Sequence, residues 1–120
     1  MQMRILIVTV SLFPLSIGAS VARAHAFLDH ASPPVGSTVG AAPHEVSLTF
    51  TQNLEGAFST IQVTGPNGAR VDQSKPQISG NTMRVGIRAA GAGTYHVQWR
   101  ALSVDTHATQ GSFAFHVGAQ

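Results

Sequence analysis

The chain has 120 residues, no cysteine and a formal net charge of +2 with histidine neutral. This length suffices for one domain, and the lack of thiols excludes disulfides, zinc–thiolate sites and cysteine-based Cu(I) sites. Beyond residue 24 there are five basic side chains against five acidic ones. No basic stripe therefore remains for nucleic-acid binding, and that class of partner is excluded.

The first 24 residues have the pattern of a secretory signal peptide. Arg4 gives a short positive start, Ile5–Ala19 is an apolar run, and Ala22 and Ala24 are the small residues of a cleavage site. The apolar run is short for a membrane span, so a retained anchor is the less favoured alternative. We therefore predict an exported, periplasmic protein.

The position of cleavage decides whether a histidine becomes the mature N-terminus. Cleavage after Ala24 leaves a domain of residues 25–120 that begins with His25. Ala24 and Ala26 also form an acceptable small-residue pair, and cleavage after Ala26 would remove His25. We expect cleavage after Ala24.

Beyond the signal peptide, apolar and polar residues alternate with a period of two, which is typical of half-buried strands. Val46, Leu48 and Phe50 show this most clearly, and Gly65–Gly68 is a turn sequence. A short strand should end before the prolines at 33 and 34. The predicted strands lie at residues 26–28, 45–50, 58–63, 69–72, 83–87, 95–99 and 113–117, with a loop over 75–81 and a glycine-rich link over 89–93. We predict an all-β fold, a seven-stranded Greek-key β-sandwich or barrel of immunoglobulin-like (cupredoxin-like) architecture.

Three residues form a candidate metal site. At a free N-terminus, His25 offers two nitrogens, its α-amine and its imidazole Nδ1. Asp105 and His107 stand two residues apart, so in extended backbone both side chains would point the same way. The resulting set of three nitrogens and one oxygen suits tetragonal Cu(II), with Ni(II) second.

A simpler interpretation of the same residues also exists. Asp-x-His in a β-protein loop is more often a turn in which the aspartate bonds its own backbone. Arg100, close in sequence, either neutralises Asp105 or marks a docking face.

The other histidines are weaker candidates for ligands. His30 and His44 lie near proline-rich turns, and His96 and His116 lie on the polar phase of strands. Surface positions are the default for all four. Met83 falls on an apolar phase and is predicted in the core.

The mature chain resembles the CopC family of periplasmic copper-binding proteins. The matching stretches are His25-Ala26-x-Leu28, Ser32-Pro33-Pro34 with Gly36-Ser37, Val46-x-Leu48-x-Phe50, Phe58-Ser59-x-Ile61-x-Val63, Gly93-Thr94-Tyr95-x-Val97-x-Trp99, Ser103-x-Asp105-x-His107 and Gly111-Ser112-Phe113-x-Phe115-x-Val117. The resemblance implies one Cu(II) ion per chain, bound by His25, Asp105 and His107. It also implies a copper transporter of the CopD type in the inner membrane as a partner.

Two features depart from the family pattern. Gln52 stands where the family often has a glutamate near the copper, and Glu55 compensates only if its loop turns it inward. Some members carry a methionine-rich loop for Cu(I), whereas this mature chain has only Met83. We therefore expect one Cu(II) site and no thioether Cu(I) site.

The predicted function is a monomeric periplasmic Cu(II) carrier or buffer in copper resistance or copper uptake, and not an enzyme. Two alternatives stay open. One is a copper-dependent oxidative enzyme of the histidine-brace type. The other is a structural or adhesion sandwich that binds no metal.

Overall fold

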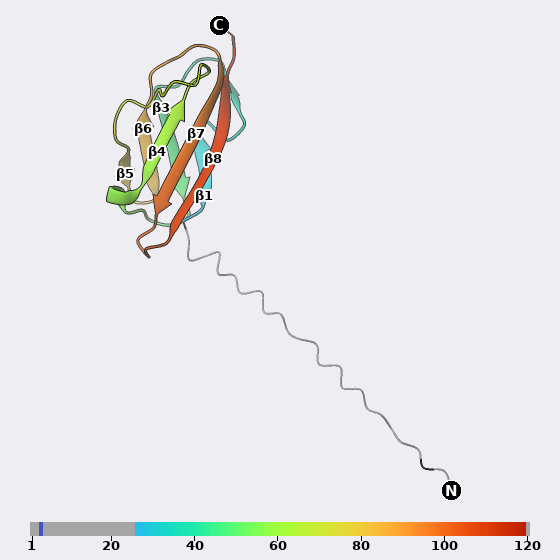
Figure 1. The fold of residues 1–120 in the computed structure, drawn as a ribbon, viewed down its shortest axis with the longest axis vertical. Coiled ribbons are helices and arrows are strands. Elements are labelled where there is room, and N and C mark those ends of the chain that lie inside the picture. The colour runs from blue at the N-terminus through green and yellow to red at the C-terminus, as the bar shows by residue number, and fades with distance from the viewer. Residues whose placement is uncertain (1–2, 4–25, 120) are drawn as a thin grey trace.

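The computed structural model describes Met3 and residues 26–119, which form a sandwich of two four-stranded sheets (Figure 1). One sheet has the order β1 (Leu28–Ser32), β3 (Glu45–Phe50), β6 (Thr82–Gly86) and β5 (Gln77–Ser79). The other has the order β2 (Thr38–Val39), β8 (Ala108–Val117), β7 (Gly93–Leu102) and β4 (Thr60–Thr64). A 3-10 turn, η2 (Gly56–Phe58), precedes β4. In this described part of the chain, no helix is long and apolar enough to span a membrane.

The core lies between the sheets and follows the alternation seen in the sequence. On β3, Val46, Leu48 and Phe50 are almost completely buried, and on β7 the residues from Tyr95 to Ala101 alternate between buried and exposed. Met83 on β6 is fully buried, as predicted. The all-β sandwich prediction is thus confirmed, because each sheet turns one apolar face inward.

The strand boundaries differ from the prediction in several places. The structure has eight strands rather than seven, because β2 pairs with β8 over only two residues, too few to give a pattern. The first strand covers Leu28–Ser32 instead of 26–28. The predicted loop over 75–81 contains β5, which pairs with β6.

The predicted strand at residues 69–72 is wrong. Only isolated bridges form there, Thr64 with Arg70 and Asp72 with Ile87. The turn before it forms as expected: Gly68 has a φ of 84°, and its N–H donates to the carbonyl of Gly65 at 3.0 Å. In addition, the side-chain carboxylate of Asp72 accepts a hydrogen bond of 3.1 Å from the Val63 N–H.

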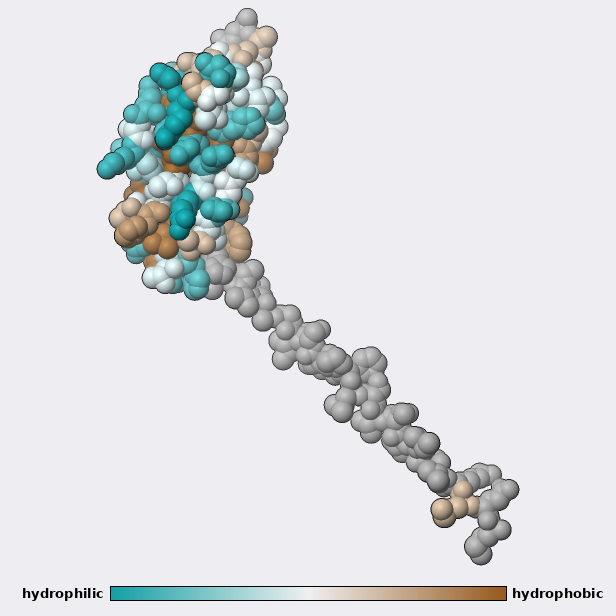
Figure 2. All heavy atoms as spheres, in the orientation of Figure 1, coloured by the Kyte–Doolittle hydropathy of each residue, from teal (hydrophilic) through white to brown (hydrophobic). Residues whose placement is uncertain are grey.

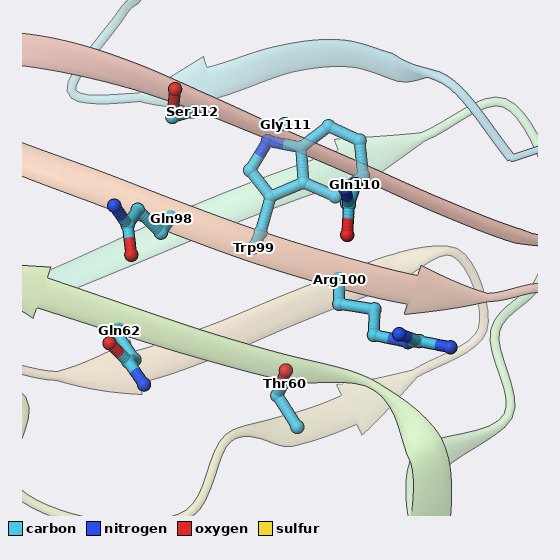
Figure 3. Close-up of a pocket in the computed structure, with 8 residues that line it drawn as sticks. All are labelled: Thr60, Gln62, Gln98, Trp99, Arg100, Gln110, Gly111 and Ser112. Carbon is cyan, nitrogen blue, oxygen red and sulfur yellow. The ribbon is translucent and has the colours of Figure 1, made fainter.

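The longest pairing in the molecule joins β7 and β8. Their antiparallel register runs without interruption from Gly93 opposite Val117 to Leu102 opposite Ala108. Together with β4 they form the front of the view in Figure 1, and this outer face is largely polar in Figure 2. Inside the pair, Trp99 lies opposite Gly111, and Figure 3 shows the indole beside that glycine.

Substitution of Gly111 by alanine should destabilise the domain by about 1–3 kcal/mol, because overpacking a tight site forces shifts of this cost. A Cβ at this position would lie 2.6 Å from Cζ2 and 2.9 Å from Cε2 of Trp99. Urea unfolding of Gly111→Ala measures the change. Gly40→Ala is the matched control because nothing lies within 4 Å of its Cβ position. Equal stabilities of the two variants would contradict this packing.

Candidate metal centre

Asp105 and His107 lie in the tight connection between β7 and β8, at one end of the sandwich. The chain reverses there: the Thr106 N–H donates to the Ser103 carbonyl at 2.9 Å, and the Ser103 N–H donates to the His107 carbonyl at 3.0 Å. Thr106 has a φ of 72°. The backbone is therefore not extended there, and a turn brings the two side chains together instead. Asp105 Oδ1 lies 3.3 Å from His107 Nδ1.

Hydrogen bonds within the turn hold the Asp105 carboxylate in place. Its Oδ1 accepts a very short hydrogen bond from the Ser103 hydroxyl and a bond of 3.1 Å from the His107 N–H. The simpler interpretation, an aspartate that bonds its own turn, is thus also correct. All these contacts use Oδ1, which leaves Oδ2 as the oxygen that can bind a cation without breaking them.

The electrostatics of the turn favour a charged carboxylate. The hydrogen bond from Ser103 is the main cause that lowers the pKa of Asp105 below its usual value, and His107 adds to the effect. Ser103 is fully buried, whereas the side chains of Asp105 and His107 are 33% and 52% exposed. The turn therefore exposes an anionic carboxylate and an imidazole to solvent, next to the buried Ser103.

The first described residues of the domain reach the same end of the sandwich. The Thr109 hydroxyl donates to the Ala26 carbonyl at 2.5 Å. The Phe27 N–H donates to Thr51 Oγ1 at 3.0 Å, and the Thr51 N–H returns a bond to the Phe27 carbonyl at 2.9 Å. Figure 1 shows the chain entering the sandwich at the end where β7 and β8 are connected. Thr109 lies two residues after His107, so these contacts place Ala26 beside the turn.

His25, the predicted signal peptide apart from Met3, and the expected cleavage position after Ala24 lie outside the described residues. Within residues 26–119 no three His, Cys, Asp or Glu side chains come together as a metal site. The structure thus brings Asp105 and His107 together, and the third predicted ligand is not among the residues it describes.

A second loop lies against the turn that carries Asp105. The Val104 N–H donates to the Asn53 carbonyl at 3.0 Å, and the Glu55 N–H donates to the Leu102 carbonyl at 2.7 Å. This places the loop of Gln52 next to the candidate site. Glu55 is exposed, so its side chain is not turned inward. It therefore does not compensate for the family's glutamate, whose place Gln52 takes.

The roles of Ser103 and Thr109 could not be found from the sequence. A buried serine two residues before an aspartate has no pattern that separates it from an ordinary turn serine. The contact between Thr109 and Ala26 joins residues 83 positions apart.

Two of the weaker candidate ligands lie on the surface, as predicted. His30 is exposed, and its Nδ1 lies 2.8 Å from Oδ2 of Asp29. His44 is also exposed.

Arg100 does not neutralise Asp105 by contact, and its other predicted role, to mark a docking face, stays a prediction. It lies on the outer face of β7 beside Thr60 and Gln98 (Figure 3). Among the described residues, no ion pair joins it to Asp105, whose carboxylate is instead held by the turn itself.

Comparisons of the sequence and of the structure with known proteins point to the same family. The CopC domain matches residues 28–118. Copper resistance protein C of Pseudomonas syringae pv. tomato is 36% identical over 108 residues, which cover 82% of this chain and 85% of the relative. Copper transport protein CutJ of Bacillus subtilis (strain 168) is 32% identical over 99 residues, which cover 79% of this chain but only 18% of CutJ. The crystal structure of CopC from Methylosinus trichosporium OB3b superposes with a TM-score of 0.74 at 29% identity, over 80% of this chain and 96% of that chain.

Substitution of Ser103 by alanine should raise the pKa of Asp105 toward its usual value, because the hydroxyl that stabilises the carboxylate is lost. A carboxyl with a lowered pKa stabilises the folded state above its unfolded-state pKa, and this contribution disappears as the pH falls through the folded-state value. The variant should therefore lose less stability between neutral pH and acid. Carboxyl carbon NMR titration measures the pKa directly.

Asp72 serves as the internal reference in the same titration. Burial tends to raise the pKa of Asp72, but hydrogen bonds from Arg70 and the Val63 N–H more than offset it and leave the pKa lowered. Since Ser103 takes no part there, the pKa of Asp72 should stay constant. An unchanged pKa of Asp105 in Ser103→Ala would show that Ser103 does not control it.

Proposed function

This chain belongs to the CopC family of copper proteins, and we propose that it is a periplasmic Cu(II) carrier or buffer. Its main copper site, for one tightly bound Cu(II) ion, would be formed by the α-amine and imidazole of His25 together with Asp105 and His107. The observation that carries this proposal is the meeting of two distant segments: the turn with Asp105 and His107, and the start of the domain at Ala26.

The reach of residue 25 follows from covalent geometry. Consecutive Cα atoms are about 3.8 Å apart, and the carbonyl of Ala26 is bonded to Thr109, two residues beyond His107. The residue bonded to the amide nitrogen of Ala26 therefore starts from this end of the sandwich, close to the turn. This supports His25 as a ligand alongside Asp105 and His107.

The burial of Ala26 supports cleavage after Ala24 rather than after Ala26. Ala26 is fully buried in the core, and its carbonyl accepts the hydrogen bond from Thr109. Removal of Ala26 would leave a small void and would take the acceptor from the half-buried hydroxyl of Thr109, both of which destabilise the fold. Cleavage after Ala24 keeps this anchor and leaves His25 with a free amine.

The donor set has the right chemistry for Cu(II). An aspartate of ordinary pKa is already ionised at neutral pH, and the lowered pKa of Asp105 extends this ionised state to more acidic pH. Its Oδ2 can bind the ion while Oδ1 keeps its bonds to the turn. The imidazole of His107 already lies 3.3 Å from this carboxylate. Three nitrogens and one oxygen favour tetragonal Cu(II). The carboxylate also occupies a coordination position that a histidine-brace enzyme would need for oxygen.

The relatives support delivery of the copper to a transporter. CutJ is named as a copper transport protein, and a segment similar to this chain makes up 18% of it. We propose that this chain, as a monomer, exchanges copper with a separate CopD-type transporter in the inner membrane, in resistance or in uptake. Asp105 and His107 are exposed enough for direct exchange.

The protein purified after export should have a mass that begins at His25 and should retain one copper with one equivalent of Cu(II), as read by native mass spectrometry. Asp105→Asn and His107→Ala should each weaken Cu(II) binding by about tenfold or more, because each removes one of four donors. Affinity should fall as the pH drops below about 8 and again below about 6.5, since protons compete for the amine and the imidazoles.

His30→Ala is the matched control, because this exposed histidine lies outside the proposed donor set. It should bind copper as the unmodified protein does. A mature mass that begins at Phe27, or copper affinity that is the same in His107→Ala and His30→Ala, would reject the proposed site.

Thr109→Val should lower Cu(II) affinity by about tenfold without removing a ligand, because groups that orient ligands typically have effects of this size. The substitution keeps the shape of the side chain but removes the hydroxyl that holds the Ala26 carbonyl. Competition titration with a Cu(II) chelator measures the change. Thr60→Val on β4, an exposed position away from the turn, is the control and should leave the affinity unchanged. Equal affinities would contradict the anchoring role of Thr109.

A further inference from the structure

Two histidines lie on adjacent strands of the β7–β8 pair, far along the sheet from the candidate copper site. In the register of this pair His96 is opposite Ala114 and His116 is opposite Thr94. His96 and His116 are therefore diagonal neighbours, two positions out of direct register. Such neighbours in an antiparallel pair have Cα atoms about 7–8 Å apart and Cβ atoms somewhat closer, within reach of long side chains.

Both histidines belong to the outer, solvent-facing side of the sheet. Along β7, His96 and Gln98 are exposed while Tyr95 and Val97 are buried. Along β8, His116 is half-buried between the fully buried Phe115 and the nearly buried Val117. Because alternate residues of a strand point to opposite faces, the two imidazoles rise from the same polar surface.

One of the two imidazoles is already oriented by a neighbour. Nδ1 of His116 lies 3.0 Å from the hydroxyl of Thr94, the residue directly opposite on β7. A hydrogen bond at one ring nitrogen fixes the ring and directs the other nitrogen, here Nε2, toward a ligand. This is the arrangement that metal-binding histidines commonly have.

The remaining neighbours in register add oxygen donors rather than charges. Thr38 of β2 is paired with His116, and Thr64 of β4 is paired with His96. Two neutral imidazoles with hydroxyl groups and water around them suit a borderline divalent ion, and Cu(II) is bound most tightly among the first-row ions.

We propose that His96 and His116, with Thr94 as the group that orients His116, form a second Cu(II) site on the outer face of the β2-β8-β7-β4 sheet. Leu102 lies six positions after His96 along β7, which corresponds to about 20 Å at 3.3 Å per residue. The ion bound there is thus separate from one held by Asp105 and His107. The site is also independent of where the signal peptide is cleaved.

The second site would bind copper more weakly than the first, because it has two nitrogen donors instead of three and no carboxylate. It would fill only once the first site is occupied. A carrier with this site takes up a second ion when copper is abundant and gives it up again when copper falls.

The test is a titration of the full mature protein with two equivalents of Cu(II), read by native mass spectrometry and by broadening of backbone amide signals in NMR. The first equivalent should broaden amides around residues 103–109, and the second should broaden those around 94–98 and 114–118. His96→Ala and His116→Ala should each weaken binding of the second ion by about tenfold or more and leave the first unchanged. Thr94→Val should have a similar but smaller effect.

His44→Ala, an exposed histidine outside the pair, is the matched control and should keep both ions. His107→Ala should lose the first ion and keep the second, which separates failure of the main site from failure of this one. Absence of broadening around 94–98 and 114–118, or a second ion held equally well by His116→Ala, would overturn the proposal.

Discussion

The uninterrupted pairing of β7 with β8 is the constraint on which the end of the molecule with the candidate site depends. Ten residues of each strand are in register, and their inward side chains, such as Tyr95 and Phe115, are stacked in the core. A slip by one residue would turn these side chains to solvent, so the register is strongly fixed. Because the register fixes where the strands end, it also fixes the turn that carries Asp105 and His107. Core packing and ligand geometry are thus set by the same pairing.

The same strand connects the turn to the beginning of the domain. Thr109 is the second residue of β8, and its hydroxyl holds the carbonyl of Ala26. The loop after β3 contacts both segments, since Thr51 is hydrogen-bonded to Phe27 and Asn53 to Val104. Three segments that are distant in sequence therefore meet through backbone groups and hydroxyls. The side chains of Asp105 and His107 stay partly exposed where these segments meet.

The sequence predicts the sandwich well because burial in a sheet has a period of two, and Val46, Leu48 and Phe50 obey it strictly. It fails for Thr38 and Val39, since two residues cannot display a period. The candidate ligands Asp105 and His107 were identifiable by type and spacing, but their proximity arises from a turn with Thr106 at positive φ. Their spacing in the sequence predicted proximity through an extended chain instead. The hydrogen bond from Thr109 to Ala26 depends on tertiary structure alone, and no local pattern encodes it.

The two ends of the sandwich differ in what they carry. Ala26 and the Asp105 turn lie at one end, whereas Gly118 follows β8 at the other, where its N–H donates to the Val39 carbonyl at 2.8 Å (Figure 1). A surface attachment made through the residues after Gly118 would hold every molecule in the same orientation, with the Asp105 turn directed away from the support. An attachment through the amine of the first residue would bury that turn against the support. The fold thus makes one terminus suitable for immobilisation, as in an electrode or sensor layer, and the other unsuitable.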